Sequence, residues 1–388
     1  MTRDSKIGVM VCGHGTRDAA GVAQFANMAN GLRERFPAWR LEHGYLEFAR
    51  PLISDGLDAL KASGVEKILA VPGLLFAAGH AKNDIPALLN NWSREQNGAI
   101  DVRYGRELGL TADILQAAHD RVAESLASLP ERAMSDTLLV TVGRGSSDPD
   151  ANGNIAKVSR LLQEYFGFGW SMAAYSGVTF PLVIPALEHA TRLGFGRIVV
   201  FPYFLFTGRL IERIYAHTDD VASRHPGVEF VKALYLGDHP GVVRSFEARV
   251  LEILDGRPEM NCQLCKYRTA LPSFEGEVGM PQTSHHHHVE GIGTDSDGDN
   301  DGAAVKGDGD GDDEGLRRMA LVSEDSLTSH DVGSSEPHPL MPAGAARKKL
   351  KKNPPDGDSD GDNHTHNHSH HPPYPHKDHP FGPRSLPS

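Results

Sequence analysis

The sequence predicts an α/β protein of two tandem lobes, each a parallel sheet flanked by helices, followed by a disordered tail. Short apolar runs alternate with amphipathic stretches of helical length, which is typical of parallel sheets covered by helices. The pattern of residues 7–95 recurs over residues 137–225, at an offset of 130 residues. Beyond residue 275, Gly, Asp, His, Pro and Ser dominate. Such a composition buries too little apolar surface to fold.

The first repeat opens with an apolar run at Ile7–Cys12, which predicts a strand ending in Gly-His-Gly. Apolar residues from Val22 to Phe36 then recur at helical spacing. Pro51 and Pro86 suit the first turns of two further helices, because proline lacks the N–H that the first turn leaves unpaired. We therefore expect helices over 51–63 and 85–92, and strands over 41–46, 67–71 and 100–104.

The second repeat has the same order of elements, with strands expected over 137–142, 171–176, 197–201 and 229–234. The repeat divides the chain into a first lobe at 1–132 and a degenerate second lobe at 133–257. A cysteine-containing segment follows at 258–275, and the acidic, histidine-rich tail occupies 276–388.

Three polar residues are expected at one rim of the first lobe. His14 directly follows the first strand, Glu47 follows the second, and His80 lies in the loop after the third. Ligand sites of parallel sheets lie at the carboxyl ends of the strands, so these side chains should converge. Two imidazoles and a carboxylate can bind a divalent metal and accept protons.

The second repeat has lost this set. Arg144 stands in place of His14, Gly177 in place of Glu47 and, after a slip of one residue, Arg209 in place of His80. None of these replacements supplies a metal ligand. The sequence therefore places the chemistry in the first lobe alone.

Three segments resemble a known family: GHGTRD, YLEFARP and VPGLLFAAGHAKNDIP. They are similar to the type II, ATP-independent sirohydrochlorin chelatases, in their long CbiX-type form related to the SirB ferrochelatases. The resemblance covers roughly residues 5–275. It implies insertion of Co²⁺ into sirohydrochlorin, in cobalamin synthesis, with His14 and His80 as metal ligands and Glu47 as a third catalytic residue.

Two other functions stay open. Insertion of Fe²⁺ for siroheme uses the same residues, since imidazole suits both ions. A metal-storage protein or metallochaperone would use the tail and bind metal without turnover. Because the tetrapyrrole is a polycarboxylate, four cations are candidate substrate contacts: Arg17, Lys82, Arg144 and Arg209. Surface or interlobe salt bridges are the other explanation for Arg144 and Arg209.

Cys262 and Cys265 form a CxxC pair after Met260. The pair alone fits a redox motif or half a zinc site. The family resemblance implies an iron–sulfur cluster, which normally takes four cysteines, so either a partner subunit, as in a homodimer sharing the cluster, or other ligands are expected. The remaining cysteine, Cys12, is predicted to be a buried small apolar residue.

The tail is expected to bind divalent ions, because histidine-rich tracts do so. It contains two tracts, with candidate ligands His285, His286, His287, His288, His364, His366, His368, His370 and His371.

The net charge of −12 lies almost entirely in the tail, since residues 275–388 contain 21 acidic and 10 basic residues. The nearly neutral globular part argues against nucleic acid as a partner. The start of the chain does not resemble a signal peptide, and no apolar run is long enough to span a membrane. A cytoplasmic protein is expected.

Overall fold

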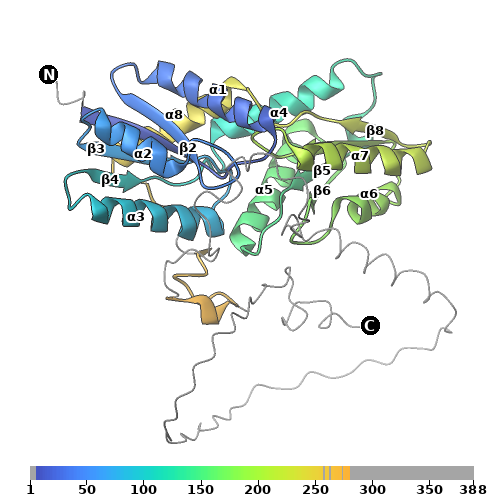
Figure 1. Ribbon diagram of the computed structural model, residues 1–388. Coiled ribbons are helices and arrows are strands. Elements are labelled where there is room, and N and C mark those ends of the chain that lie inside the picture. The colour runs from blue at the N-terminus through green and yellow to red at the C-terminus, as the bar shows by residue number, and fades with distance from the viewer. Residues whose placement is uncertain (1–5, 257, 262–263, 273, 280–388) are drawn as a thin grey trace, which may run out of the picture. The chain divides into compact units, whose positions relative to one another are not determined.

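The computed structural model describes residues 6–256, 258–261, 264–272 and 274–279. They form two four-stranded parallel sheets with strand orders β2-β1-β3-β4 and β6-β5-β7-β8 (Figure 1). The first repeat comprises β1 (Ile7–Gly13), α1 (Ala19–Arg35), β2 (Arg40–Tyr45), α2 (Ile53–Ala62), β3 (Lys67–Pro72), the π-helix η2 (His80–Asp84), α3 (Ile85–Glu95), β4 (Asp101–Tyr104) and α4 (Ala112–Leu126).

The second repeat follows a short helix, η3 (Met134–Asp136). It comprises β5 (Thr137–Gly143), α5 (Pro149–Phe166), β6 (Trp170–Tyr175), α6 (Val183–Thr191), β7 (Arg197–Pro202), α7 (Arg209–Arg224), β8 (Glu229–Lys232) and α8 (Pro240–Leu254). A last short helix, η5, spans Glu275–Glu277.

The two sheets share one register. Gly13 pairs with Tyr45 in the first sheet, and Gly143 pairs with Tyr175 at the matched place in the second. A residue that follows a strand of the first sheet therefore has the same backbone position as its counterpart in the second sheet. The residues at the carboxyl ends of the two sheets can be compared one by one.

Each sheet is buried on both faces. One face of the first sheet packs on α2 and α3, and one face of the second packs on α6 and α7. The remaining two faces contribute to a single core that both repeats share. Apolar strands such as β5, which is buried along its whole length, are the expected consequence of this layering.

The last helix of each repeat packs on the other repeat. Helix α8 contacts α1 and β3 of the first repeat, whereas α4 contacts α5 and β8 of the second. Figure 1 shows α8, in yellow, among the blue elements of the first lobe. The first lobe is thus completed by residues at the end of the second repeat.

The expected strands are all present, with small differences at their ends. Two expectations about helices were wrong. Helix α2 begins at Ile53 and not at Pro51, with the Asp55 carboxylate accepting a hydrogen bond from the Leu52 N–H at 2.8 Å. His80 does not lie in a loop but opens the π-helix η2.

Residues 280–388, with both histidine tracts, lie outside the described part of the chain, and so does Cys262. The segment after α8 is described further than the expected boundary at residue 275. Lys266 Nζ pairs with Glu277 at 2.7 Å, and the Gly279 N–H donates to the Tyr267 carbonyl at 3.0 Å. None of the described helices has the length and apolar character needed to cross a membrane.

Candidate metal centre

His14, Glu47 and His80 converge at the carboxyl ends of β1, β2 and β3. One ligand atom of each lies within 4.8 Å of the other two, and no other such group of His, Cys, Asp and Glu occurs among the described residues. His14 Nε2 lies 3.3 Å from Glu47 Oε1, and the two imidazole rings meet edge to face at 4.6 Å. Glu47 is only 6% exposed, whereas both histidines are half-buried.

Hydrogen bonds orient both imidazoles. His14 Nδ1 lies 2.9 Å from the Gly15 carbonyl, and His80 Nδ1 lies 2.7 Å from Asp84 Oδ2. A carbonyl and a carboxylate are acceptors, so each Nδ1 donates to its partner, and Nε2 is the ring nitrogen left to face the site. A metal ion bound here would be ligated through Nε2.

The π-helix η2 brings His80 and Asp84 together. In a helix with more than four residues per turn, residues i and i+4 stand almost one above the other. The Asp84 side chain has no exposed area, and its Oδ1 accepts a second hydrogen bond from Asn83 Nδ2 at 3.2 Å. A buried carboxylate behind a metal-binding histidine fixes its ring and raises its basicity as a ligand.

Gly15 allows the Glu47 loop to approach His14. Its φ of 104° lies in the region that glycine favours, and a Cβ there would overlap the Glu47 carbonyl oxygen. The Glu47 N–H donates to the His14 carbonyl at 3.0 Å, which ties the two loops together. The candidate ligands His14 and Glu47 are therefore held by backbone as well as by side-chain contacts.

Three of the four candidate substrate contacts are exposed: Arg17, Arg144 and Arg209. Arg17 stacks its guanidinium over the Phe48 ring at 4.6 Å, one residue from Glu47. Arg144 follows β5 and Arg209 begins α7, so both rise from the rim of the second lobe.

Lys82 departs from the expected role. Its side chain is 3% exposed, and its Nζ lies 2.7 Å from Asp148 Oδ2 and 3.5 Å from Asp150 Oδ2. Burial lowers its pKa, but the surrounding negative groups outweigh burial and the net shift is upward. An ammonium committed to two buried carboxylates of the second repeat is not a surface contact for substrate.

Cys12 is fully buried in β1, and burial raises the pKa of its thiol, as expected for a small core residue. Cys265 is also buried and lies near Lys82. The CxxC segment therefore lies close to η2.

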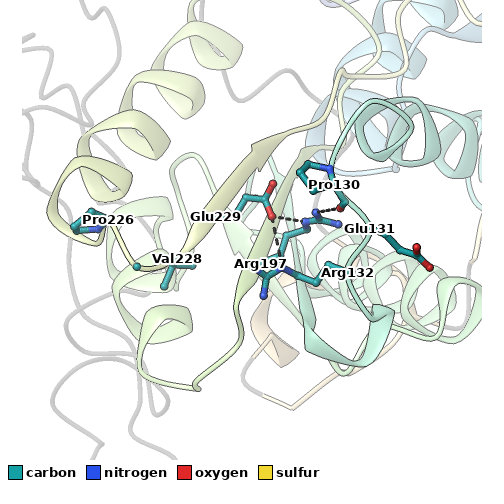
Figure 2. Close-up of a pocket in the computed structure, with 8 residues that line it drawn as sticks. Pro130, Glu131, Arg132, Arg197, Pro226, Val228 and Glu229 are labelled. Atoms are coloured by element: carbon teal, nitrogen blue, oxygen red, sulfur yellow. Dashed lines mark hydrogen bonds and ion pairs between the residues drawn. The ribbon is translucent and has the colours of Figure 1, made fainter.

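A hollow in the second lobe lies at the opposite end of the strands. It is lined where β7 and β8 begin, and Figure 2 shows Arg197 and Arg132 pointing to Glu229. Arg197 Nε lies 2.9 Å from Glu229 Oε2, and its Nη2 donates to the Pro130 carbonyl at 2.9 Å. The arginines that line this hollow pair with residues that also line it, so together these residues form a structural ion-pair network.

The CbiX family model matches residues 8–125 and again residues 138–253. A sirohydrochlorin cobaltochelatase of Priestia megaterium is 35% identical over 264 residues, which cover 68% of this chain and 85% of the relative. The chain belongs to the CbiX family.

Two further relatives agree with this placement. A sirohydrochlorin ferrochelatase of Priestia megaterium is 29% identical, covering 64% of this chain and 90% of that protein. The structure of the sirohydrochlorin chelatase SirB from Bacillus subtilis subspecies spizizenii, in complex with cobalt, matches with a TM-score of 0.55 and 27% identity, over 65% of this chain and 96% of that one. The CbiX fold thus extends through both repeats.

Asp84 is a candidate functional residue that sequence reasoning missed in this CbiX chain. Two patterns pointed to it. It lies four residues after His80, and the matched position in the second repeat is Arg213, a loss that parallels the replacement of His80 by Arg209.

Asp84→Asn is expected to weaken metal use about 10- to 100-fold, because the amide neither enforces the Nδ1–H tautomer nor raises the basicity of His80. The measurement is the half-saturating Co²⁺ concentration for metallation of sirohydrochlorin. Glu188→Gln is the matched control, since Glu188 Oε2 pairs with His225 Nε2 at 2.9 Å outside the site. An equal response of both variants would contradict the role of Asp84.

Proposed function

We propose that the chain is a sirohydrochlorin cobaltochelatase, which inserts Co²⁺ into the ring without ATP during cobalamin synthesis. The observation that supports this best is the set of His14, Glu47 and His80, with both Nε2 atoms directed to ligation. The cobaltochelatase relative is the more similar of the two Priestia megaterium proteins, at 35% against 29% identity for the ferrochelatase. Insertion of Fe²⁺ is the second candidate.

The three side chains suit a metal that has to leave again. Two neutral imidazoles and one carboxylate fill only part of the coordination sphere, so ring nitrogens can enter while protein ligands depart. Metallation releases two pyrrole protons. Glu47 and His14, 3.3 Å apart, are bases that can accept them as their bonds to the metal break.

The test is direct metallation of sirohydrochlorin by the purified protein with Co²⁺, Fe²⁺ or Ni²⁺, followed by absorption under anaerobic conditions. Faster turnover with Co²⁺ than with Fe²⁺ is expected. The opposite preference would indicate the siroheme reaction. Metal binding without any turnover would indicate a storage protein or metallochaperone.

Exposed arginines of the second lobe are proposed to bind substrate carboxylates. Arg144→Ala and Arg209→Ala should each raise the KM for sirohydrochlorin roughly tenfold and leave kcat nearly unchanged, because the charge-assisted contact exists before and during the reaction. Arg160→Ala is the control for net charge, as Arg160 is exposed on α5 and pairs with Glu164. A loss of kcat equal to that of a His14 variant would contradict a purely binding role. Arg17, over Phe48, is a further candidate contact.

An iron–sulfur cluster at Cys262 and Cys265 is part of the proposal, together with a homodimer that shares it. The buried Cys265 offers one thiol, and Cys12 is enclosed in the sheet and cannot be another ligand. One chain therefore supplies at most two thiolates toward the usual four. A dimer in solution that separates when Cys265 is changed to serine is the expected result.

The tail is proposed to collect metal. Deletion of residues 280–388 should leave turnover at saturating Co²⁺ unchanged and reduce it when Co²⁺ is limiting, because tethered histidines raise the metal concentration near the site. Cutting at residue 280 retains the Lys266–Glu277 pair. Identical curves for the two proteins over the whole Co²⁺ range would contradict a role in delivery.

A further inference from the structure

The turn that holds His80 also makes the buried connection to the second repeat. His80 and Asp84 lie on one side of η2, whereas Lys82, halfway between them, points to Asp148 and Asp150 at the start of α5. In a turn of this pitch, residue i+2 faces away from residues i and i+4. The metal site and this connection therefore share five residues of backbone.

The second half of the connection is rigid. Asp148 is the N-cap of α5, and its Oδ1 accepts a hydrogen bond from the Asp150 N–H at 3.1 Å while its Oδ2 binds Lys82. Both carboxylates are almost fully buried, with side-chain exposures of 1% and 6%. Lys82 is thus bound to carboxylates that are fixed at the N-terminal end of α5 and are not mobile.

The segment after α8 contacts the same cluster. Asn261 Nδ2 donates to Asp150 Oδ1 at 3.2 Å, and Asp150 Oδ2 faces Lys82. The Cys265 segment is therefore linked to η2 through one carboxylate.

The second repeat has no equivalent of this connection at its own rim. The residue matched to Lys82 is Ile211, which is buried in α7, and the residue matched to Asp148 is Asp18. Asp18 caps α1 through the Gly21 N–H at 2.9 Å. A lysine at this position is present only beside His80, the candidate metal ligand, and not beside Arg209.

Buried ion pairs contribute little net stability, because desolvation of the charges cancels much of their attraction. What such a pair does provide is one defined geometry. We propose that Lys82 is a positioning residue, which holds the His80 turn in register with the second repeat through Asp148 and Asp150. The inference rests on the proposed function, and it assigns Lys82 to the placement of metal and not to substrate contact.

The kinetic test compares two buried cations in the full-length protein. Lys82→Met should lower kcat for Co²⁺ insertion at least about tenfold with KM for sirohydrochlorin changed less than about twofold, since small displacements of a reacting group cost that much. Arg197→Met is the matched control. Arg197 is also 3% exposed and pairs with Glu229 at 2.9 Å, at the far end of the second sheet (Figure 2). Lys82→Arg should recover most of the lost kcat.

The second measurement does not require activity. In amide hydrogen exchange without metal, Lys82→Met should speed exchange over residues 78–86, and Arg197→Met should leave that segment unchanged. If Lys82→Met does not fold, Asp150→Asn, which weakens the same connection, replaces it in both measurements.

Both results are needed to support the inference. Equal loss of kcat in the Arg197 control, or unchanged exchange at residues 78–86, overturns it. If the unaltered protein does not metallate sirohydrochlorin, the proposed function fails, and the exchange result alone decides whether Lys82 positions the turn.

Discussion

His14→Ala and His80→Ala are each expected to lower the rate of sirohydrochlorin metallation at least about a hundredfold, because each removes one of the three candidate ligands for the incoming ion. Both variants should also lose stability. Loss of His14 removes a hydrogen bond to the Gly15 carbonyl and a neighbour of the buried Glu47 carboxylate. Loss of His80 removes a partner from the buried Asp84 and should cost about 1–3 kcal/mol.

The rates are measured by absorption at saturating Co²⁺, and stabilities by thermal unfolding. His189→Ala is the control, because His189 is an exposed histidine on α6, outside the site. Metallation at near-normal rates in either ligand variant would contradict the assignment of the metal centre.

Gly15→Ala is expected to abolish metallation and to destabilise the protein by about 1–3 kcal/mol or more. The added Cβ meets the Glu47 carbonyl oxygen in a backbone conformation that alanine avoids, so the Glu47 loop has to move away from His14. Strain and loss of a ligand are therefore combined in this variant.

The second repeat provides the matched control. Gly145 has a φ of 87°, and a Cβ there would overlap the Gly177 carbonyl in the same way, but no ligand is attached to that loop. Gly145→Ala should show similar destabilisation with most of its turnover retained. Comparable loss of turnover in both variants would show that strain alone, and not the displacement of Glu47, stops the reaction.

Much of the fold could be predicted from periodicity, because the central strands β1, β3, β5 and β7 are mostly apolar runs that end in Gly or Pro. Helix ends were harder. Pro51 suggests a helix start, yet the carboxylate of Asp55 caps the chain one residue later, at Leu52. The packing of α4 and α8 on the opposite repeats was beyond sequence reasoning, since amphipathic periodicity states that a face is buried and not which sheet covers it.

For the metal centre, the comparison of repeats was sufficient to select His14, Glu47 and His80. The comparison did not predict the burial of Lys82, because a lysine two residues from a candidate ligand is expected to be exposed and able to contact substrate. Only the three-dimensional placement of Asp148 and Asp150 shows where the ammonium goes. Asp84 was recoverable in principle, as its spacing from His80 and its replacement by Arg213 were both visible.

The packing of α8 on β3 and α1 bears on how this gene can be shortened. A transcript that ends after the first repeat would encode every metal ligand, yet one face of its sheet would lack α8 and stay open to water. A chain shortened to the first repeat would therefore lose part of the core beside its candidate metal ligands. The second repeat thus covers the core of the first lobe and also presents Arg144 and Arg209 at its own rim.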